Sequence, residues 1–219
     1  MTSDKRGEMD NYLNKIIQGD CLEVMKGMPD KSVDLVLTDP PYGKKASKGT
    51  NGFGSAKNRR YVDDWDNSIP SLKVFNEMLR IGKNVMIFGG NYFAHLLPPS
   101  KCWLIWDKKG DIKFHNPFAD CELIYTNFSK PIKKYTFKQQ GFITDSKDKR
   151  YHPTQKPTEL LEILIRDWTR ENSLILDPFV GSGTTCISAK KLNRNFIGIE
   201  ISPEYCKIAN QRLAQEVLL

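Results

Sequence analysis

The sequence lacks any long run of apolar residues. Residues 1–12 are polar and charged, without the apolar stretch that a secretory signal requires, and no later run approaches the roughly 20 residues that span a membrane. We therefore expect a soluble cytoplasmic protein without a membrane partner. Internal repeats and low-complexity segments are also missing, and 219 residues are enough to bury one sizeable core. The sequence thus predicts a single domain over residues 1–219.

Cysteine and histidine are scarce and scattered. The five cysteines form no Cys-x-x-Cys pair, and the three histidines form no cluster at the spacing of metal ligands. This pattern argues against a disulfide framework and against a zinc site, so we expect no metal. The cysteines are expected to be reduced and mostly buried.

The net charge of +7 is concentrated in two segments. The first cluster comprises Lys44, Lys45, Lys48, Lys57, Arg59 and Arg60. The second comprises Lys130, Lys133, Lys134, Lys138, Lys147, Lys149 and Arg150. One such segment is more often a solvated loop, but two of them flanking the motifs described below favour contact with nucleic-acid phosphates.

Short apolar runs alternate with segments of helical spacing. Strands are expected at 32–38, 84–88, 102–106, 122–126, 174–176 and 196–199. Helices are expected at 71–81, from 157, at 184–192 and from 203, the last with Ser202 as its N-cap. This alternation predicts an α/β fold with a mostly parallel sheet, helices on both faces, and ligands bound beyond the carboxyl ends of the strands.

A glycine-rich turn follows the strand expected at 174–176. Residues 177–185 read Asp-Pro-Phe-Val-Gly-Ser-Gly-Thr-Thr, and the glycines let the backbone approach a ligand closely. An ordinary tight turn is one alternative. A phosphate loop is another, but Gly-x-x-x-x-Gly-Lys is absent and Asp177 would repel a phosphate. An acid suits a cationic cofactor such as S-adenosylmethionine, which carries an ammonium and a sulfonium group.

An acid also ends the strand that follows this turn. Glu200 stands about twenty residues after the glycines, where adenosine-binding sheets hold the ribose hydroxyls. From this half of the chain we predict S-adenosylmethionine contacts by Asp177, Phe179, Gly181, Ser182, Gly183, Thr184, Thr185, Glu200 and Ile201.

The block Asp39-Pro40-Pro41-Tyr42 ends the strand expected at 32–38. The exocyclic nitrogen of adenine is a poor nucleophile because its lone pair is delocalised into the ring. The Asp39 carboxylate and the Pro40 carbonyl can accept its two hydrogens and localise that lone pair for attack on a methyl group, while the prolines keep the acceptors rigid. Tyr42 offers an aromatic face on which a flipped base can stack. A proline-rich turn with an incidental tyrosine is the alternative.

With these motifs in this order, the chain resembles the β group of DNA amino-methyltransferases over nearly its whole length, from residues 17–21 through 152–157 to Glu200. The resemblance implies a Rossmann-like methyltransferase fold, base flipping, and the catalytic residues Asp39, Pro40, Pro41 and Tyr42. It also implies that Asp20 contacts the adenine of the cofactor and that residues 152–157 lead into a helix beside the methionine moiety. The further cofactor contacts expected on this ground are Asp20, Cys21, Asp39, His152, Lys156 and Pro157.

The target base and the recognition segments follow from the same resemblance. Family members that act on cytosine usually carry Ser in place of Asp39, which favours adenine N6 in double-stranded DNA, as in a restriction–modification system. The alternatives are a cytosine-N4 or RNA methyltransferase and a non-catalytic DNA-binding subunit. Segments 43–69 and 107–150 are the expected recognition regions, with Gln139, Gln140 and Arg150 as candidate base readers, and a homodimer is compatible with the family. The expected DNA contacts are Lys44, Lys45, Lys48, Arg59, Arg60, Lys133, Lys134, Lys138 and Arg150.

Overall fold

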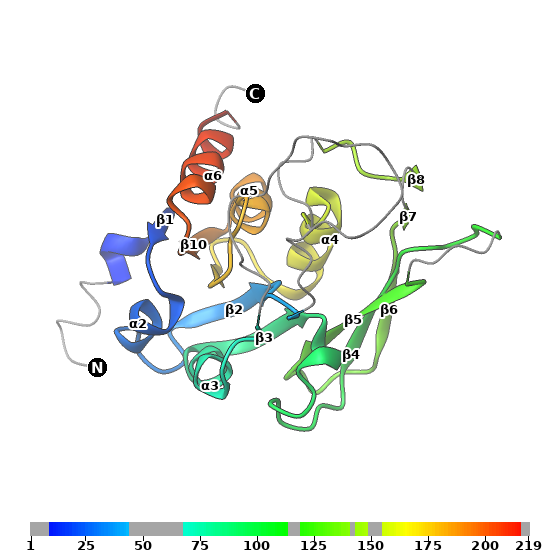
Figure 1. Ribbon diagram of the computed structural model, residues 1–219, viewed down its shortest axis with the longest axis horizontal. Helices are drawn as coiled ribbons and strands as arrows, with labels where there is room; N and C mark the ends of the chain where they lie inside the picture. Colours follow the sequence, from blue (N-terminus) through cyan, green and yellow to red (C-terminus); the bar gives the residue numbers. More distant parts are fainter. Residues whose placement is uncertain (1–8, 44–67, 114–118, 141–142, 149–154, 216–219) are drawn as a thin grey trace.

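An eight-stranded sheet forms the centre of the protein (Figure 1). The computed structural model describes residues 9–43, 68–113, 119–140, 143–148 and 155–215. The strand order is β1-β10-β9-β2-β3-β5-β4-β6. The strands are β1 Lys15–Gln18, β2 Val33–Thr38, β3 Gly82–Phe88, β4 Trp103–Asp107, β5 Cys121–Thr126, β6 Lys133–Thr136, β9 Leu174–Asp177 and β10 Asn195–Glu200. A separate two-stranded hairpin pairs β7 Gln139–Gln140 with β8 Ile143–Thr144.

The sheet is mostly parallel, as the sequence predicts. The strands β1, β10, β9, β2 and β3 pair in parallel, and β4 pairs in parallel with β6. Strand β5 runs antiparallel to both of its neighbours, β3 and β4. The reversed strand β5 therefore begins at the edge of the sheet where the adjacent strand β3 ends.

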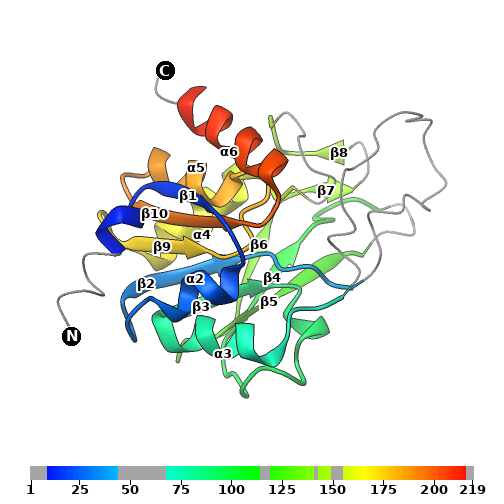
Figure 2. The same ribbon diagram turned by 60° about the vertical axis from the view of Figure 1, so that its left-hand side comes forward.

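Helices cover both faces of the sheet (Figures 1 and 2). One face carries α2 Cys21–Lys26 and α3 Leu72–Ile81, and the other carries α4 Thr158–Trp168, α5 Thr184–Lys191 and α6 Pro203–Gln215. Alternating residues of β2 divide between two apolar cores: Leu35 and Leu37 pack with α4 and α5, whereas Val36 packs with α2 and α3. This alternation is what a strand buried on both faces requires.

The chain reverses its winding direction between β2 and β9. From β2 the chain passes through α3 to the adjacent β3, and from β9 it passes through α5 to β10 on the opposite side. Strands β2 and β9 are themselves neighbours, with Val36 opposite Leu176. A crevice opens at such a reversal beyond the carboxyl ends of the two strands, and ligands of α/β sheets bind there.

Several short elements escape the sequence prediction. Strand β1 has four residues, and α2 has six residues that begin after the N-cap Asp20, whose Oδ1 accepts hydrogen bonds from the backbone N–H groups of Leu22 and Glu23. Strand β6 has the polar sequence Lys-Lys-Tyr-Thr and closes one edge of the sheet. Its pairing with β4 compensates for a pattern that lacks the apolar alternation of a strand. The predicted elements differ from the observed ones by one or two residues at their ends.

The structure shows the state of the five cysteines and the lengths of the apolar helices. All five cysteines are free; Cys102, Cys186 and Cys206 are buried, Cys21 is half-buried and Cys121 is exposed. Within the described ranges, no helix is both long and apolar enough to cross a membrane.

The two-faced core generates a prediction about stability. Leu164 of α4 is completely buried, whereas Leu72 at the start of α3 is 49% exposed. We expect Leu164→Ala to lower the free energy of unfolding by about 2–5 kcal/mol, because it leaves a cavity between helix and sheet. The control Leu72→Ala should change it by no more than about 0.5 kcal/mol. Urea unfolding followed by circular dichroism measures both, and equal losses would show that α4 does not pack on the sheet as described.

Candidate active site

An open pocket lies at the reversal between β2 and β9. The ends of these strands, the glycine turn and the segment before α4 surround it. Its lining comprises Thr38, Asp39, Phe88, Gln155, Lys156, Leu161, Asp177, Phe179, Val180, Gly181, Ser182, Thr184 and Thr185. Two motifs that are 138 residues apart in the sequence, at Asp39 and Asp177, thus meet in one cavity.

Four acidic residues stand in a row along this edge of the sheet. Asp20 follows β1, Glu200 ends β10, Asp177 ends β9 and Asp39 follows β2, and these strands are consecutive in the sheet. The backbone N–H of Gly19 donates to the carbonyl of Glu200 at 2.9 Å and ties the first two strand ends together. Strands lie about 4.8 Å apart, so the row extends over roughly 14 Å. That length suits an extended ligand lying across the strand ends.

Asp177 is a buried carboxylate in the floor of the pocket. Its side chain accepts hydrogen bonds from the Thr38 hydroxyl at 2.7 Å, from the backbone N–H of Phe179 at 3.0 Å and from Thr185. Burial raises the pKa of Asp177 to about 6, although these hydrogen bonds oppose the rise, and nearby Asp39 adds to it. In the part of the chain that the structure describes, no lysine or arginine forms an ion pair with Asp177. A ligand with positive charge would compensate the buried carboxylate.

The glycine turn is held from two sides. Glu200 accepts a hydrogen bond from the backbone N–H of Gly181 at 2.9 Å, and buried Arg212 of α6 donates to the Ser182 carbonyl at 2.6 Å. Gly183 has φ +89°, and a Cβ there would lie 2.9 Å from the Cβ of Ala209. Gly181 has φ +51° with no atom within 4 Å of a Cβ, so its free side faces the pocket space. The turn therefore presents bare backbone to a ligand.

Asp39 belongs to a compact network with Lys156, Tyr42 and Glu122. Lys156 Nζ donates to Asp39 Oδ2 at 2.5 Å and lies 3.3 Å from Glu122 Oε1. The Tyr42 hydroxyl lies 2.5 Å from Asp39 Oδ1 and 2.7 Å from Glu122 Oε1. Lys108 reaches Glu122 Oε2 from the end of β4 at 3.8 Å. Two acids and two lysines thus share one largely buried cluster.

Burial and charge shift the pKa values of this cluster. Burial raises the pKa of Asp39, Lys156 opposes that shift, and Glu122 adds to it. For Glu122, burial acts to raise the pKa, but Lys156 and Lys108 outweigh it and hold the pKa below its usual value. Burial acts to lower the pKa of Lys156, yet Asp39 and Glu122 raise it. Lys156 therefore stays charged and Glu122 is the more acidic carboxyl group.

Tyr42 is packed into this network by its ring. The ring stacks on Tyr92 with centroids 4.9 Å apart, and Phe93 contacts it edge-on at 5.8 Å. A Cβ on Gly89, which has φ +64°, would lie only 2.4 Å from the Tyr42 ring, so glycine makes room for it. The predicted stacking of a base on Tyr42 remains a prediction, because one ring face is already covered by Tyr92.

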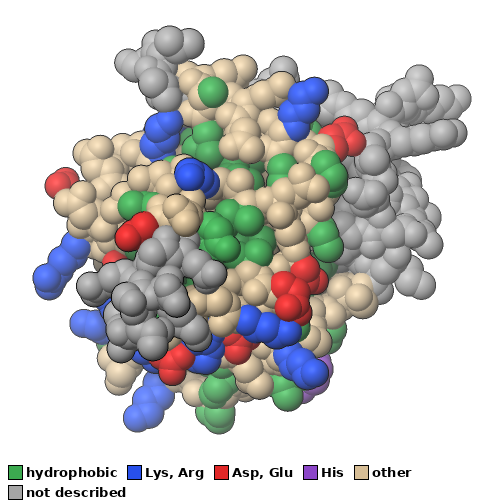
Figure 3. All heavy atoms as spheres, turned by 90° about the vertical axis from the view of Figure 1, so that its left-hand side faces the viewer, with side chains coloured by type: hydrophobic (Ala, Val, Ile, Leu, Met, Phe, Trp, Pro, Cys, Tyr) green, Lys and Arg blue, Asp and Glu red, His purple; other side chains and the backbone are tan. Residues whose placement is uncertain are grey.

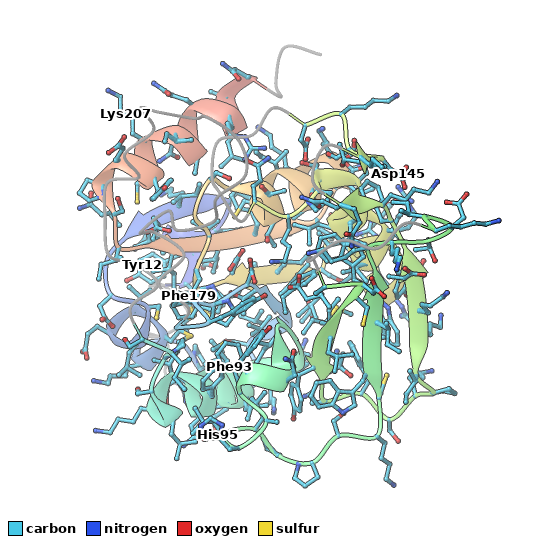
Figure 4. The ribbon with its side chains drawn as sticks, turned by 45° about the vertical axis from the view of Figure 1, so that its right-hand side comes forward. Tyr12, Phe93, His95, Asp145, Phe179 and Lys207 are labelled. Atoms are coloured by element: carbon cyan, nitrogen blue, oxygen red, sulfur yellow. The ribbon has the colours of Figure 1, made fainter. Side chains whose placement is uncertain are left out.

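The other cofactor residues expected from the sequence occupy different positions. Phe179 lines the pocket and packs against the core cluster that includes Phe93, and both are labelled in Figure 4. Lys156 lines the pocket, and its ammonium is directed to the two carboxylates, so its predicted contact with the cofactor stays a prediction. Cys21 begins α2 beside Asp20, Ile201 is 68% exposed, and Pro157 caps α4 and lines a neighbouring pocket. His152 lies outside the described residues.

Only some of the predicted DNA-contact residues lie in the part of the chain that the structure describes. Lys133 lies over the Trp168 ring at 5.4 Å, while Lys134 pairs with Asp107 at 3.1 Å and Lys138 with Asp111 at 2.7 Å. These three side chains lie on or next to β6, at the sheet edge far from β1. Lys44, Lys45, Lys48, Lys57, Arg59, Arg60, Lys149 and Arg150 lie outside the described residues. The face shown in Figure 3 carries separated basic side chains with acidic ones among them.

The candidate base readers also differ from one another. Gln140 is 3% exposed and donates through Nε2 to the Ala119 carbonyl at 2.9 Å, so it is a buried packing residue and not an exposed reader. Gln139 lines the pocket next to the active site together with Gln155 and Lys156. Trp106 is buried, as predicted for a core residue, and Trp103 packs edge-on against Tyr125.

Glu122 and Lys108 are site residues that the sequence reasoning missed. Glu122 was expected only as the first residue of a strand, and Lys108 only as part of a recognition segment. An acid and a lysine at the open ends of two paired strands are common on protein surfaces, so no local pattern marks them. The signal would have been the antiparallel pairing of β4 and β5, which places Trp106 opposite Glu122 at the catalytic edge.

Comparisons with known proteins agree with this geometry. Residues 98–211 match the family described as DNA methylase, whose name joins N6 and N4 methyltransferases. The chain is 30% identical to the type II methyltransferase M2.DpnII of Streptococcus pneumoniae over 94% of this chain and 92% of that protein. It is 28% identical to the type II methyltransferase M.HinfI of Haemophilus influenzae, over 94% of this chain and 70% of the relative. The crystal structure of an M1.HpyAVI–SAM complex superimposes with a TM-score of 0.57 and 25% identity, covering 91% of this chain and 98% of that one.

The glycine turn supports a prediction about backbone strain. Gly183→Ala should lower the free energy of unfolding by about 2–4 kcal/mol, because it combines left-handed strain with a collision against Ala209. Gly181→Ala is the matched control and should cost only about 1–2 kcal/mol, since it meets the strain without the collision. Urea unfolding of both variants gives the comparison, and a Gly181→Ala variant that is as unstable as Gly183→Ala would contradict it.

The raised pKa of Asp177 predicts pH-dependent cofactor binding. A cationic ligand binds the ionised carboxylate, which a pKa of about 6 makes progressively rarer as the pH falls. We expect the Kd for S-adenosylmethionine to increase about tenfold from pH 7 to pH 5. In Asp177→Asn the affinity should be lower and the pH dependence largely lost, since this amide does not titrate. Isothermal titration calorimetry at several pH values tests this, and an unchanged slope in the variant would assign the titration to another group.

Proposed function

The chain belongs to the DNA methylase family and is an S-adenosylmethionine-dependent DNA methyltransferase, and from that premise we propose that it methylates the exocyclic N6 amino group of adenine. The observation that carries the proposal is the meeting of Asp39 and Asp177 in one pocket at the ends of adjacent strands. One acid faces the position of an amino group, and the other suits a cation. Residue assignments within the site are part of the proposal.

The pocket is suited to the cofactor by its charge and its shape. The buried Asp177 carboxylate compensates a positive ligand, and Gly181 leaves space where a side chain would project. Across the row of acids, we assign the methionine end to Asp177, the ribose to Glu200 and the adenine to Asp20. Glu200 already orients the turn through Gly181, so its carboxylate is fixed before a ribose binds.

The protein's part in the reaction is to position one nitrogen. S-adenosylmethionine, when bound, supplies an electrophilic methyl group on its sulfonium. Asp39 and the Pro40 carbonyl accept the two amino hydrogens, which draws the nitrogen toward tetrahedral geometry and directs its lone pair at the methyl group. Lys156 and Tyr42 hold the Asp39 carboxyl group through its two oxygens and so fix its orientation.

DNA is the substrate of the family, and its double-stranded form is part of the proposal. A base must leave the duplex to reach Asp39 because the pocket lies inside the sheet edge, so we propose base flipping. Segments 43–69 and 107–150 are proposed to bind DNA, with phosphate contacts from Lys133, Lys134 and Lys138 where they release their acidic partners. The single domain over 1–219 and a homodimer stay predictions.

Hydrogen bonding by Asp39 does not by itself separate adenine from cytosine as the target base. Both bases present an exocyclic amino group, and both a carboxylate and a serine hydroxyl can accept a hydrogen bond from it. Adenine is favoured because family members that act on cytosine usually carry Ser in place of Asp39, whereas this chain carries a carboxylate, which Lys156 and Tyr42 hold in place. A cytosine-N4 activity is the alternative product.

The test is single-molecule sequencing of DNA from cells that express the wild-type protein or Asp39→Ala. We expect N6-methyladenine at one short motif, and a loss of at least about a hundredfold in the variant because an acceptor for the amino group is gone. The exposed Asp10→Ala is the matched control and should methylate as the wild type does.

The other possible results of the sequencing experiment distinguish the alternative functions. Methylcytosine in place of methyladenine would overturn the adenine assignment and retain the reaction. A wild-type protein that binds S-adenosylmethionine but modifies no DNA would overturn the proposal, in favour of RNA as substrate or a non-catalytic subunit. Full activity in Asp39→Ala would remove Asp39 from its proposed role.

A further inference from the structure

The oxygen atoms of Asp39, Tyr42 and Glu122 form a continuous chain. Asp39 Oδ1 lies 2.5 Å from the Tyr42 hydroxyl, which lies 2.7 Å from Glu122 Oε1. Both separations are within the range of O–H···O hydrogen bonds, and the first is at its short end. The three oxygens come from the loop after β2 and from the start of β5, so the sheet brings them together from distant parts of the chain.

The hydrogen bonds among these three oxygens require more protons than the Tyr42 hydroxyl supplies. Two hydrogen bonds among three oxygens require two protons, whereas the Tyr42 hydroxyl has one. If both carboxyl groups were ionised, one of the two close contacts would join oxygens with no proton between them. The contact pattern is therefore that of a chain with one additional proton on a carboxyl group.

The surroundings place that proton on Asp39. Burial and the neighbouring Glu122 favour the protonated form of Asp39, while Lys156 and Lys108 together favour the ionised form of Glu122. The resulting order is an Asp39 O–H donating to Tyr42 and a Tyr42 O–H donating to the Glu122 carboxylate. The Tyr42 pKa is raised well above its ordinary value by burial and by both acids, so the tyrosine stays neutral at either end of a transfer.

Three charged groups and one aromatic ring face this chain of oxygens, each from a different element. Lys156 precedes α4 and contacts all three members, at 2.5 Å from Asp39, 3.3 Å from Glu122 and 3.5 Å from the Tyr42 oxygen. Lys108 follows β4 and faces Glu122 Oε2, and Asp177 at the end of β9 interacts electrostatically with Asp39. The ring of Phe88 at the end of β3 lies 5.1 Å from Lys156 Nζ and covers the cluster with an apolar surface.

We propose that Tyr42 and Glu122 form a proton relay that carries away from Asp39 the proton released when the target amino group is methylated. The inference rests on the proposed methylation of an exocyclic amino group. It assigns Glu122 a role in the reaction as a relay and positioning residue, one that does not touch the base.

Every bond, electron pair and proton in the methyl-transfer step is accounted for. The nitrogen lone pair forms the new N–CH₃ bond, and the S–CH₃ bond breaks with its electron pair remaining on sulfur, which becomes a neutral thioether. The nitrogen then carries a positive charge and one proton more than the product, and this proton passes to the Asp39 carboxylate. Asp39 protonates the Tyr42 oxygen as Tyr42 gives its own hydroxyl proton to Glu122, so Tyr42 is neutral before and after the transfer.

The relay has an outlet at Glu122. Its second oxygen faces Lys108, whose side chain is 23% exposed, while Lys156 on the other side is only 9% exposed. Because Lys156 and Lys108 keep Glu122 the more acidic carboxyl group, Glu122 holds the proton only transiently and gives it up to solvent on the Lys108 side. Before the next turnover Asp39 must be ionised again, because only the carboxylate can take up the proton that the methylated amino group releases.

The kinetic test uses Glu122→Gln, Tyr42→Phe and the double variant, with single-turnover transfer from tritiated S-adenosylmethionine to unmethylated plasmid DNA. Each single variant should slow transfer about tenfold to a hundredfold, with unchanged Kd for S-adenosylmethionine, because the amide and the phenyl ring cannot pass a proton. The double variant should be no slower than the slower single variant, since both changes interrupt one path. Wild-type rates in both single variants, or losses that multiply in the double variant, would overturn the relay.

The pH profile separates a relay from a structural support. Transfer in the wild type should fall as the pH decreases through the raised pKa of Asp39, because the acceptor form is lost. In Glu122→Gln the neighbouring negative charge is gone, so this acidic limb should move to lower pH while the maximal rate is reduced. Glu122→Asp should recover part of the rate. An acidic limb that stays in place in Glu122→Gln would overturn the inference.

A spectroscopic readout does not depend on methyl transfer. Infrared difference spectra of the cofactor-free protein, recorded across a pH titration, should show the C=O band of a protonated carboxylic acid that persists above the ordinary range of aspartate. Because Asp177, with a pKa of about 6, contributes to the same band, the comparison is made in an Asp177→Asn background. There the band should disappear when Asp39→Asn is added and remain when the control Asp10→Asn is added. Absence of this band in the wild type would overturn the extra proton. If the wild type shows the band but methylates no DNA, the proposed function fails and the proton count stands.

Discussion

The buried ammonium group of Lys156 is the interaction on which the catalytic edge depends. It sits between Asp39 and Glu122, two acids that would otherwise repel each other at close range in a site with little water. Removing one partner of such a buried group leaves uncompensated charge and typically costs about 3–5 kcal/mol. The lysine also joins three parts of the molecule, because it precedes α4, contacts the loop after β2 and reaches the first residues of β5.

The sheet places carboxylates with different surroundings at neighbouring strand ends, which a single ion pair cannot do. Asp177 and Asp39 are both aspartates that follow or end buried strands, yet their surroundings differ. Hydrogen-bond donors surround Asp177, which has no described cation beside it, whereas Asp39 is paired with a lysine. A carboxylate surrounded by hydrogen-bond donors and a carboxylate paired with a lysine therefore lie one strand apart. The reversal of winding between β2 and β9 creates the room for both.

The sequence predicts much of the cofactor half and less of the proton-handling half, for a physical reason. Asp177, Gly181 and Glu200 lie within about twenty residues and follow a strand–turn–helix–strand unit whose geometry is local. Asp39 is recognisable because prolines end its strand. Glu122 becomes a neighbour of Asp39 only through the antiparallel pairing of β5 with β3, and no spacing along the chain encodes that pairing.

The same reasoning explains the details that sequence patterns left out or misjudged. Tyr42 is predicted to offer an aromatic face to a base, and the sequence pattern does not indicate that Tyr92, from the segment after β3, stacks on its ring. Gln140 was considered an exposed reader, but its β7–β8 hairpin turns it inward to the Ala119 carbonyl. The polar strand β6 exists because β4 offers it a partner, not because its residues favour a sheet. In each case a contact between distant segments outweighs the local preference.

The reversed direction of β5 has a consequence for how the protein can change over time. Glu122 and Lys108 stand at the base of the β4–β5 hairpin, where the backbone N–H of Lys108 donates to the Asp120 carbonyl at 2.9 Å. The hairpin loop belongs to the region proposed to read DNA, so the residues proposed to choose a target sequence are close in the chain to those proposed to relay protons. Insertions that lengthen this loop are free to diversify the target only while the two base residues keep their register. Selection for a new target and selection for turnover therefore act on the same hairpin. We expect its connecting loop to vary in sequence and length, while the paired residues of β4 and β5 are preserved.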